Sequence, residues 1–226
     1  MDTRDLDARW RGTEPDRHLT WSTILEGRSF FEAAQRIFDL RTAKRVLEIG
    51  PGYGRLLGGL RELGLTPDFY LGVDLSEARV RRLSEELGSA DVKFMAGDAR
   101  TVDLSAFAPF DLMISSATFE HISPTFGAAL IHLRQFLTGR AVLDLIDGGD
   151  DGSGVSRRKV LVRLYSPVEI VSTLQVCGFR CEGLVRFDMA TTEFEIEPSR
   201  LERREGLSMQ DNKTALVHRF MVVGET

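Results

Sequence analysis

The feature that most constrains the fold is the stretch 45–57, where a short apolar run leads into three glycines, Gly50, Gly52 and Gly54. Apolar residues then return at helical spacing, at Leu56, Leu57, Leu60 and Leu63. This order predicts a strand, a tight turn and a helix. Glycines in such a turn allow its backbone dihedrals and let backbone N–H groups approach a nucleotide-like ligand.

Length and composition indicate one ordinary globular domain. The chain has 226 residues, of which 42% are hydrophobic and 28% charged, and its net charge is −5. An acidic balance favours no nucleic-acid partner. The chain has no 18-residue apolar run, and its first residues lack the apolar core of a signal peptide, so we expect a cytoplasmic protein without a membrane partner. Cys177 and Cys181 are expected to be ordinary reduced cysteines.

After position 45, short apolar runs alternate with helical patterns, which predicts an α/β fold with a mostly parallel, Rossmann-like sheet and helices on both faces. The seven expected strands cover 45–49, 69–73, 92–96, 110–115, 141–146, 180–187 and 215–223. The expected helices cover 55–63, 76–87, 125–137 and the segment that begins at Pro167, with Ser166 as its cap and Gly178 after its end. A long charged segment, 193–212, separates the last two strands.

The first 44 residues differ from the remainder and are expected to form an N-terminal helical extension, leaving 45–226 as the main domain. From Ser22 onward, apolar residues recur at the spacing of an amphipathic helix that includes Phe30 and Phe38. Two hypotheses stay open and are compatible. The helix packs on the edge of the sheet, or it forms a lid that brings aromatic side chains to a ligand pocket.

The glycine spacing argues against a dinucleotide site. In the dinucleotide pattern G-x-G-x-x-G the third glycine would stand at 55, where this chain has Arg55, and the glycine turn lacks the Walker lysine that a triphosphate site would need. Glu48, two residues before Gly50, would place a negative charge by the turn. That charge is unfavourable for a pyrophosphate but favourable for a ligand with a cationic ammonium or sulfonium group.

The segment Glu48-Ile-Gly-Pro-Gly-Tyr-Gly54 resembles the first motif of class I S-adenosylmethionine-dependent methyltransferases, E/D-x-G-x-G-x-G. The resemblance covers roughly residues 45–223 and implies a seven-stranded sheet with a C-terminal antiparallel strand pair. It also implies S-adenosyl-L-methionine as the cofactor, and cofactor binding by Glu48, Gly50, Gly52 and Gly54.

Further pieces follow in the order of that family. Tyr70-Leu-Gly-Val-Asp-Leu-Ser76 resembles the second strand, whose terminal acid, here Asp74 followed by Leu75, holds the ribose hydroxyls. In the next motif Asp98 would accept the adenine amino group, and the backbone amide of Ala99 would face the ring. Ser115, at the end of the fourth strand, would lie near the amino-acid part of the cofactor.

His121 is the candidate catalytic residue because it follows the fourth strand at the carboxyl edge of the sheet, where ligands bind in such folds. Methyl transfer to a high-pKa oxygen needs a general base, whereas a neutral amine can react without one. His121 therefore acts either as a base or as a pocket-lining residue. The neighbouring Glu120 is a weaker candidate, expected to be a solvated or helix-capping acid.

Two further segments lie near the same edge. The acidic loop 144–152 has enough carboxylates to hold Mg²⁺, but a polar turn is the preferred interpretation, so we expect no metal site. The basic run 156–159 with Arg163 either faces an anionic substrate or forms a solvated edge.

The sequence thus predicts an enzyme that transfers a methyl group to an oxygen or nitrogen of a small molecule, such as a sugar or a natural-product scaffold. Alternatives are methylation of a protein or RNA, and a non-catalytic subunit that retains cofactor binding. A dehydrogenase is a further alternative, which nicotinamide binding would reveal. A homodimer is compatible with the sequence.

Overall fold

The computed structural model describes residues 21–122, 125–146, 154–157, 161–191, 207–209 and 215–226. Its centre is a sheet of seven strands in the order β3-β2-β1-β4-β5-β10-β8. Strands β1 to β5 are parallel, while β10 is antiparallel to both β5 and β8. The predicted seven-stranded, mostly parallel sheet with its antiparallel C-terminal pair is therefore confirmed. The strands are β1 (Arg45–Ile49), β2 (Phe69–Asp74), β3 (Val92–Ala96), β4 (Phe110–Ser115), β5 (Leu137–Ile146), β8 (Arg180–Thr191) and β10 (Ala215–Glu225).

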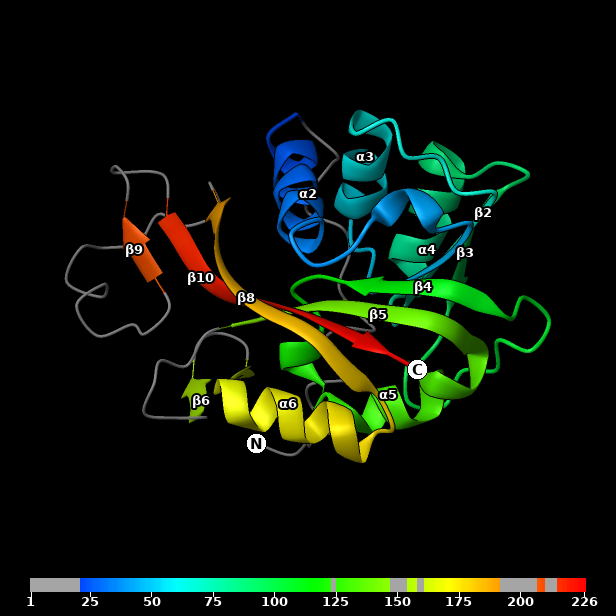
Figure 1. Ribbon diagram of the computed structural model, residues 1–226. Helices are drawn as coiled ribbons and strands as arrows, with labels where there is room; N and C mark the ends of the chain where they lie inside the picture. The colour runs from blue at the N-terminus through cyan, green and yellow to red at the C-terminus, as the bar shows by residue number, and fades with distance from the viewer. Residues whose placement is uncertain (1–20, 123–124, 147–153, 158–160, 192–206, 210–214) are drawn as a thin grey trace.

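Helices cover both faces of the sheet, as expected of a fold in which parallel strands alternate with helices. In Figure 1, α2, α3 and α4 lie on one side of the sheet and α5 and α6 on the other. These helices are α2 (Trp21–Ala34), α3 (Arg55–Glu62), α4 (Glu77–Leu87), α5 (Gly127–Leu133) and α6 (Pro167–Val176). Successive side chains of β1 alternate between the two cores: Val46 joins the core under α2 and α3, and Leu47 joins the core over α5 and α6.

Shorter elements complete the described chain. A hairpin of β6 (Gly154–Arg157) and β7 (Leu161–Leu164) forms a separate two-stranded sheet, and β9 (Leu207–Met209) pairs with β10. Short 3-10 turns are η1 (Leu40–Thr42), η2 (Phe119–His121) and η3 (Arg134–Phe136). Apart from β9, the predicted charged segment 193–212 lies outside the described residues.

Local signals placed several boundaries correctly. The Ser76 and Ser166 side chains accept hydrogen bonds from the backbone N–H groups of Arg79 and Glu169, as N-caps do. Gly178, after α6, has a φ of +81°, a left-handed conformation that suits glycine.

The predicted helix 125–137 was wrong at its C-terminal end, where η3 follows α5 and β5 begins at Leu137. Strand pairing decides this boundary, because Leu137 aligns with Phe110 of β4. Both helix and strand bury apolar residues here, so the spacing of Leu133, Phe136 and Leu137 does not distinguish them.

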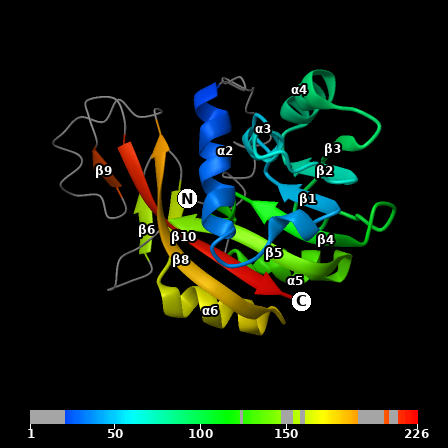
Figure 2. The same ribbon diagram turned by 45° about the horizontal axis from the view of Figure 1, so that its top comes forward.

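The N-terminal helix α2 packs over one face of the sheet, in the core that it shares with α3, rather than on the edge of the sheet. Phe30 and Phe31 are fully buried and meet edge to face, with ring centroids 5.1 Å apart. Helices α2 and α3 lie side by side in both views (Figure 1, Figure 2). A Cβ added at Gly59 would lie 2.5 Å from the backbone carbon of Gly27, so glycine at both positions permits this close crossing.

This crossing predicts the effect of Gly59→Ala. In an ordinary helix interior this change stabilises by about 1 kcal/mol. Here the new methyl meets the backbone of α2, so we expect destabilisation by about 1–3 kcal/mol. Denaturant unfolding measures the change. The control is Glu32→Ala, at an exposed position of α2 that pairs with Arg28, where a loss of about 0.5 kcal/mol or less is expected. Stabilisation by Gly59→Ala would contradict the packing argument.

Candidate functional site

The glycine turn after β1 lies at the carboxyl edge of the sheet and leads directly into α3. All three glycines have left-handed φ values, +71° at Gly50, +58° at Gly52 and +89° at Gly54. A Cβ at Gly50 would lie 2.2 Å from Thr118 Oγ1, and one at Gly54 would lie 2.5 Å from Leu87 Cδ1. A Cβ at Gly52 would meet no atom within 4 Å. The outer glycines are thus required by packing, while Gly52 presents backbone to open space.

Asp74 ends β2 next to this turn. Its Oδ2 accepts a hydrogen bond from the Gly52 N–H at 3.2 Å, and its Oδ1 accepts one from the Ser76 N–H at 2.9 Å. The carboxylate is 5% exposed, and Leu75, which follows it, is half-buried. A carboxylate in this position at a strand end can accept hydrogen bonds from the two hydroxyls of a ribose.

Asp98 and Ala99 follow β3 and lie beside β2, because the Gly97 N–H donates to the Asp74 carbonyl oxygen at 2.9 Å. Arg100 donates to Asp98 from its Nε at 2.9 Å and from its terminal nitrogen at 2.6 Å. Ala99 is 9% exposed. The sequence analysis found Asp98 but missed the guanidinium that orients it, two residues along the chain.

Glu48 lies in the interior rather than at the surface of the turn. Its side chain is 1% exposed and accepts a hydrogen bond from the Tyr70 hydroxyl. Burial raises the pKa of the Glu48 carboxyl to about 7, even though the Tyr70 hydrogen bond and the Arg55 charge oppose that rise. The expected fixed negative charge by the turn is therefore replaced by a carboxyl that is partly protonated near neutral pH.

The end of β4 and the loop after it are held by contacts with three other elements. The Ser115 hydroxyl donates to the Ile49 carbonyl oxygen at 2.7 Å, so its hydrogen bond joins β4 to β1. Ser116 accepts a hydrogen bond from Arg55 at 2.6 Å and donates to Asp144. Ala117 has a φ of +52°, and its N–H donates to Asp144 Oδ1 at 2.8 Å. A non-glycine residue in this conformation is strained, and such strain concentrates at functional sites.

His121 follows this loop, at the end of η2. It is half-buried, and its backbone N–H donates to the Thr118 carbonyl oxygen at 2.9 Å. The structure therefore places His121 at the carboxyl edge, near the glycine turn that Thr118 contacts. Its role as a base or as a pocket-lining residue stays a prediction.

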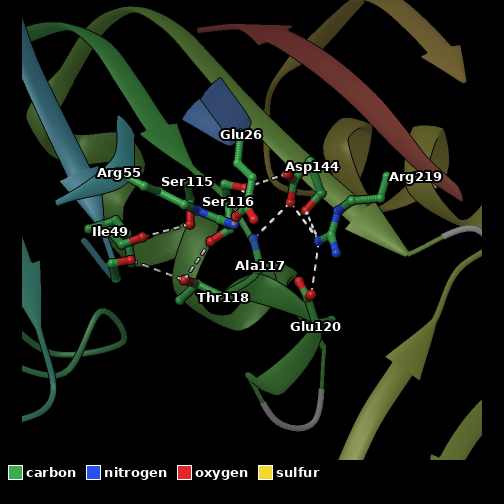
Figure 3. A network of polar contacts seen from close by, with 11 residues as sticks. Glu26, Ile49, Arg55, Ser115, Ser116, Ala117, Thr118, Glu120, Asp144 and Arg219 are labelled. Atoms are coloured by element: carbon green, nitrogen blue, oxygen red, sulfur yellow. Dashed lines mark hydrogen bonds and ion pairs between the residues drawn. The ribbon is translucent and has the colours of Figure 1, made fainter. Parts of the chain in front are cut away.

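Beside the loop lies a buried charge network that the sequence analysis missed (Figure 3). Arg219 of β10 donates to Asp144 Oδ1 of β5 at 2.6 Å and to Glu120 Oε1 at 2.8 Å. The three side chains are no more than 4% exposed. Arg55 of α3 extends the network to α2 through a 3.3 Å ion pair with Glu26.

One expectation about this region was wrong, because Glu120 is buried and not a solvated acid. Burial alone would raise the pKa of its carboxyl, but the charges of Arg219 and His121 bring that pKa below its ordinary value. Asp144 belongs to β5, within the predicted strand 141–146. A signal existed, because Asp144 and Arg219 each interrupt an apolar strand run with charges of opposite sign.

Nothing in the described part of the chain gathers three or more His, Cys, Asp or Glu side chains as a metal site would. Residues 147–152 of the acidic loop and 158–159 of the basic run lie outside that part. Cys177 and Cys181 are free thiols, as expected. Among the described helices, none has the length and apolarity needed to span a membrane.

Comparison with known proteins adds two findings. Residues 46–139 match the family model of a methyltransferase domain. Solved structures match over most of the chain.

A methyltransferase structure from Anabaena variabilis is 12% identical in sequence, with a TM-score of 0.69. The match covers 100% of this chain and 95% of the Anabaena chain. The Burkholderia thailandensis 1,6-didemethyltoxoflavin-N1-methyltransferase is 19% identical in sequence, with a TM-score of 0.61. That match covers 90% of this chain and 78% of the Burkholderia chain.

A third similar structure is the N-terminal domain of EvdMO1, crystallised in the presence of S-adenosylhomocysteine and D-fucose. It is 18% identical, with a TM-score of 0.59, and the match covers 100% of this chain and 97% of that one. No curated protein matches the sequence.

Residues 46–139 thus match a methyltransferase domain, and the fold of the chain is that of solved methyltransferase structures.

The buried Glu48 carboxyl predicts a dependence of stability on pH. Its pKa is about 7 in the folded chain and about 4.5 in the unfolded chain. Below pH 4.5 the Glu48 carboxyl is protonated in both the folded and the unfolded chain. As the pH rises from 4.5 to 7, this carboxyl ionises only in the unfolded chain, so the free energy of unfolding falls across this window. Glu48→Gln keeps an acceptor for the Tyr70 hydroxyl and removes the group that ionises. We therefore expect this variant to raise the free energy of unfolding by about 2–3 kcal/mol at pH 8. Denaturant unfolding at pH 4.5 and pH 8 measures it, and an equal effect at both values would contradict a shifted Glu48.

Proposed function

We propose that this methyltransferase transfers the methyl group of S-adenosylmethionine to an oxygen or nitrogen atom of a small molecule. The observation that carries the cofactor half of the proposal is the open backbone at Gly52, directly beside the Asp74 carboxylate. A ligand that approaches Gly52 would meet carboxylate oxygens suited to ribose hydroxyls. The residues present therefore fit the nucleoside part of the cofactor.

Each strand end would hold one part of the cofactor. Asp74 and Leu75 would bind at the ribose, and Asp98 with the Ala99 amide would bind at the adenine, on the neighbouring strand end. The turn that faces the amino-acid part would be shaped by Gly50, Gly52 and Gly54. Glu48 and Ser115 would support this turn. When bound, the cofactor supplies a sulfonium methyl group for in-line displacement, and the protein has mainly to align the acceptor and exclude water.

Three observations support a small acceptor. Two similar structures carry small molecules in their descriptions, 1,6-didemethyltoxoflavin and D-fucose. The net charge of −5 gives no support for RNA as a substrate. The loop after β4 reads Ser115-Ser-Ala-Thr118 and lacks the N/D-P-P-Y/F tetrad typical of base-amino methyltransferases. His121 would take the acceptor proton where the acceptor needs a base.

Calorimetric titration with S-adenosylhomocysteine, with NAD in parallel, tests the cofactor half. We expect binding of the first compound alone. Binding of NAD alone would overturn the interpretation of the glycine turn. Binding of S-adenosylhomocysteine without methyl transfer to any acceptor in a broad small-molecule panel would favour the non-catalytic alternative.

Asp74→Ala should weaken S-adenosylhomocysteine binding by about 1–3 kcal/mol, because the ribose hydroxyls and the Gly52 N–H lose their acceptor. The control is Asp68→Ala, at an exposed carboxylate before β2, which should bind as the wild type does. Titration calorimetry compares the two. Equal affinity of Asp74→Ala and wild type would remove Asp74 from the ribose site.

His121→Ala should leave S-adenosylhomocysteine affinity nearly unchanged. If His121 is the base, turnover of the acceptor found by screening falls by about 10²–10⁴-fold. Transfer of a radiolabelled methyl group measures the rate. A loss below tenfold would assign His121 to the pocket lining instead.

A further inference from the structure

The guanidinium of Arg219 joins the last strand of the sheet to the loop that carries His121. It is the shared partner of Asp144 and Glu120, which lie 75 and 99 residues away from it in the chain. Asp144 in turn holds the hydroxyl of Ser116 and the N–H of the strained Ala117. Asp144 thus fixes the start of the segment 116–121, and the Glu120 side chain fixes its end. Both carboxylates are held by the Arg219 guanidinium.

The charges of this network do not cancel. Glu26 and Arg55 offset each other, whereas Arg219 faces two carboxylates, so the five side chains carry one excess negative charge. Glu120 directly precedes His121 in the chain, and the two groups interact electrostatically. An imidazole that gains a proton at this position would meet a carboxylate that is already ionised and held in place.

The pair is also incompletely satisfied. Within the described part of the chain, Glu120 Oε2 and Arg219 Nε are buried and have no hydrogen-bond partner. A buried polar atom without a partner costs about 1–3 kcal/mol, and native structures contain few of them. A pair retained only for stability would be expected to satisfy these atoms, so their presence beside the catalytic candidate favours a functional role.

We propose that Arg219 is a positioning residue of this methyltransferase, which acts through Glu120 and Asp144 to fix the segment 116–121 and with it the imidazole of His121. The inference rests on the proposed function, in which His121 faces the acceptor. In this arrangement Arg219 holds Glu120, and Glu120 stabilises the imidazolium that forms when His121 takes the acceptor proton. The described charged side chains of this network are Glu120 of η2 and, on other elements, Arg219, Asp144, Arg55 and Glu26.

Two variants test the proposal. Arg219→Lys keeps the buried positive charge, but the lysine side chain ends one bond short of the terminal nitrogen with which Arg219 contacts both carboxylates. Glu120→Gln keeps an acceptor for Arg219 and removes only the charge, so it leaves Arg219 paired with Asp144 and protects the fold. The matched control is Arg140→Lys, because Arg140 also contacts two carboxylates of the same sheet, Glu182 and Glu225, away from His121.

The readout is the NMR spectrum of the histidine ring signals in the full chain. The chain has four histidines, and the His121 signal is the one lost in His121→Asn. Glu120→Gln should displace the His121 signal, because the negative charge beside the imidazole is gone. Arg219→Lys should displace or broaden the His121 signal, and Arg140→Lys should leave it unchanged.

Calorimetry with S-adenosylhomocysteine separates this inference from the proposed function. Both variants should bind it within about threefold of the wild type, because the network lies outside the Asp74 and Asp98 positions. Wild type that fails to bind would overturn the proposed function, whatever the histidine signals show. A His121 ring signal that stays at the wild-type position in both Glu120→Gln and Arg219→Lys would overturn the positioning role, even where cofactor binding is intact.

Discussion

Arg219 places one positive charge in the interior of the protein. The placement of the carboxylates around it follows from the free energy needed to remove that charge from water. Removing an ion from water costs several kcal/mol, which is offset only when the partners are close and well aligned. Asp144 and Glu120 meet that condition at 2.6 and 2.8 Å. Because they come from β5 and η2, the antiparallel strand β10 and the loop after β4 have to meet at one point. The position of the loop at the carboxyl edge is therefore decided by electrostatics as well as by strand pairing.

The N-terminal helix belongs to the same arrangement. Glu26 pairs with Arg55, which contacts Ser116 in the loop after β4. The glycine crossing of α2 and α3 brings these side chains within reach. Helix α2 is thus a structural support of the loop, and its described phenylalanines lie in the core. A division of the chain into 1–44 and 45–226 stays a prediction.

Two buried carboxyls at this edge are brought to different protonation states by their surroundings. Glu48 has a neutral hydroxyl, Tyr70, as its hydrogen-bond partner, so burial dominates and its pKa rises to about 7. Glu120 is equally buried, but the Arg219 guanidinium reverses the effect of burial and holds its pKa below the ordinary value. Carboxyls whose surroundings move their pKa values apart can take different roles in binding and in proton transfer. Here the charged one lies next to His121.

The sequence by itself determined the features that depend on residues close together along the chain. Periodicity predicted the seven strands and most of the helices, Ser76 and Ser166 predicted their caps, and the glycine spacing predicted the turn, while the cofactor followed from the resemblance of this turn to a family motif. Only the tertiary structure decided that Glu48 faces Tyr70, that Ser115 hydrogen-bonds to the backbone of β1, and that Arg219 pairs with Asp144 and Glu120. The physical reason is that turns, caps and amphipathic faces are short-range. The partner of a buried charge, by contrast, is selected by which distant strands the sheet brings together.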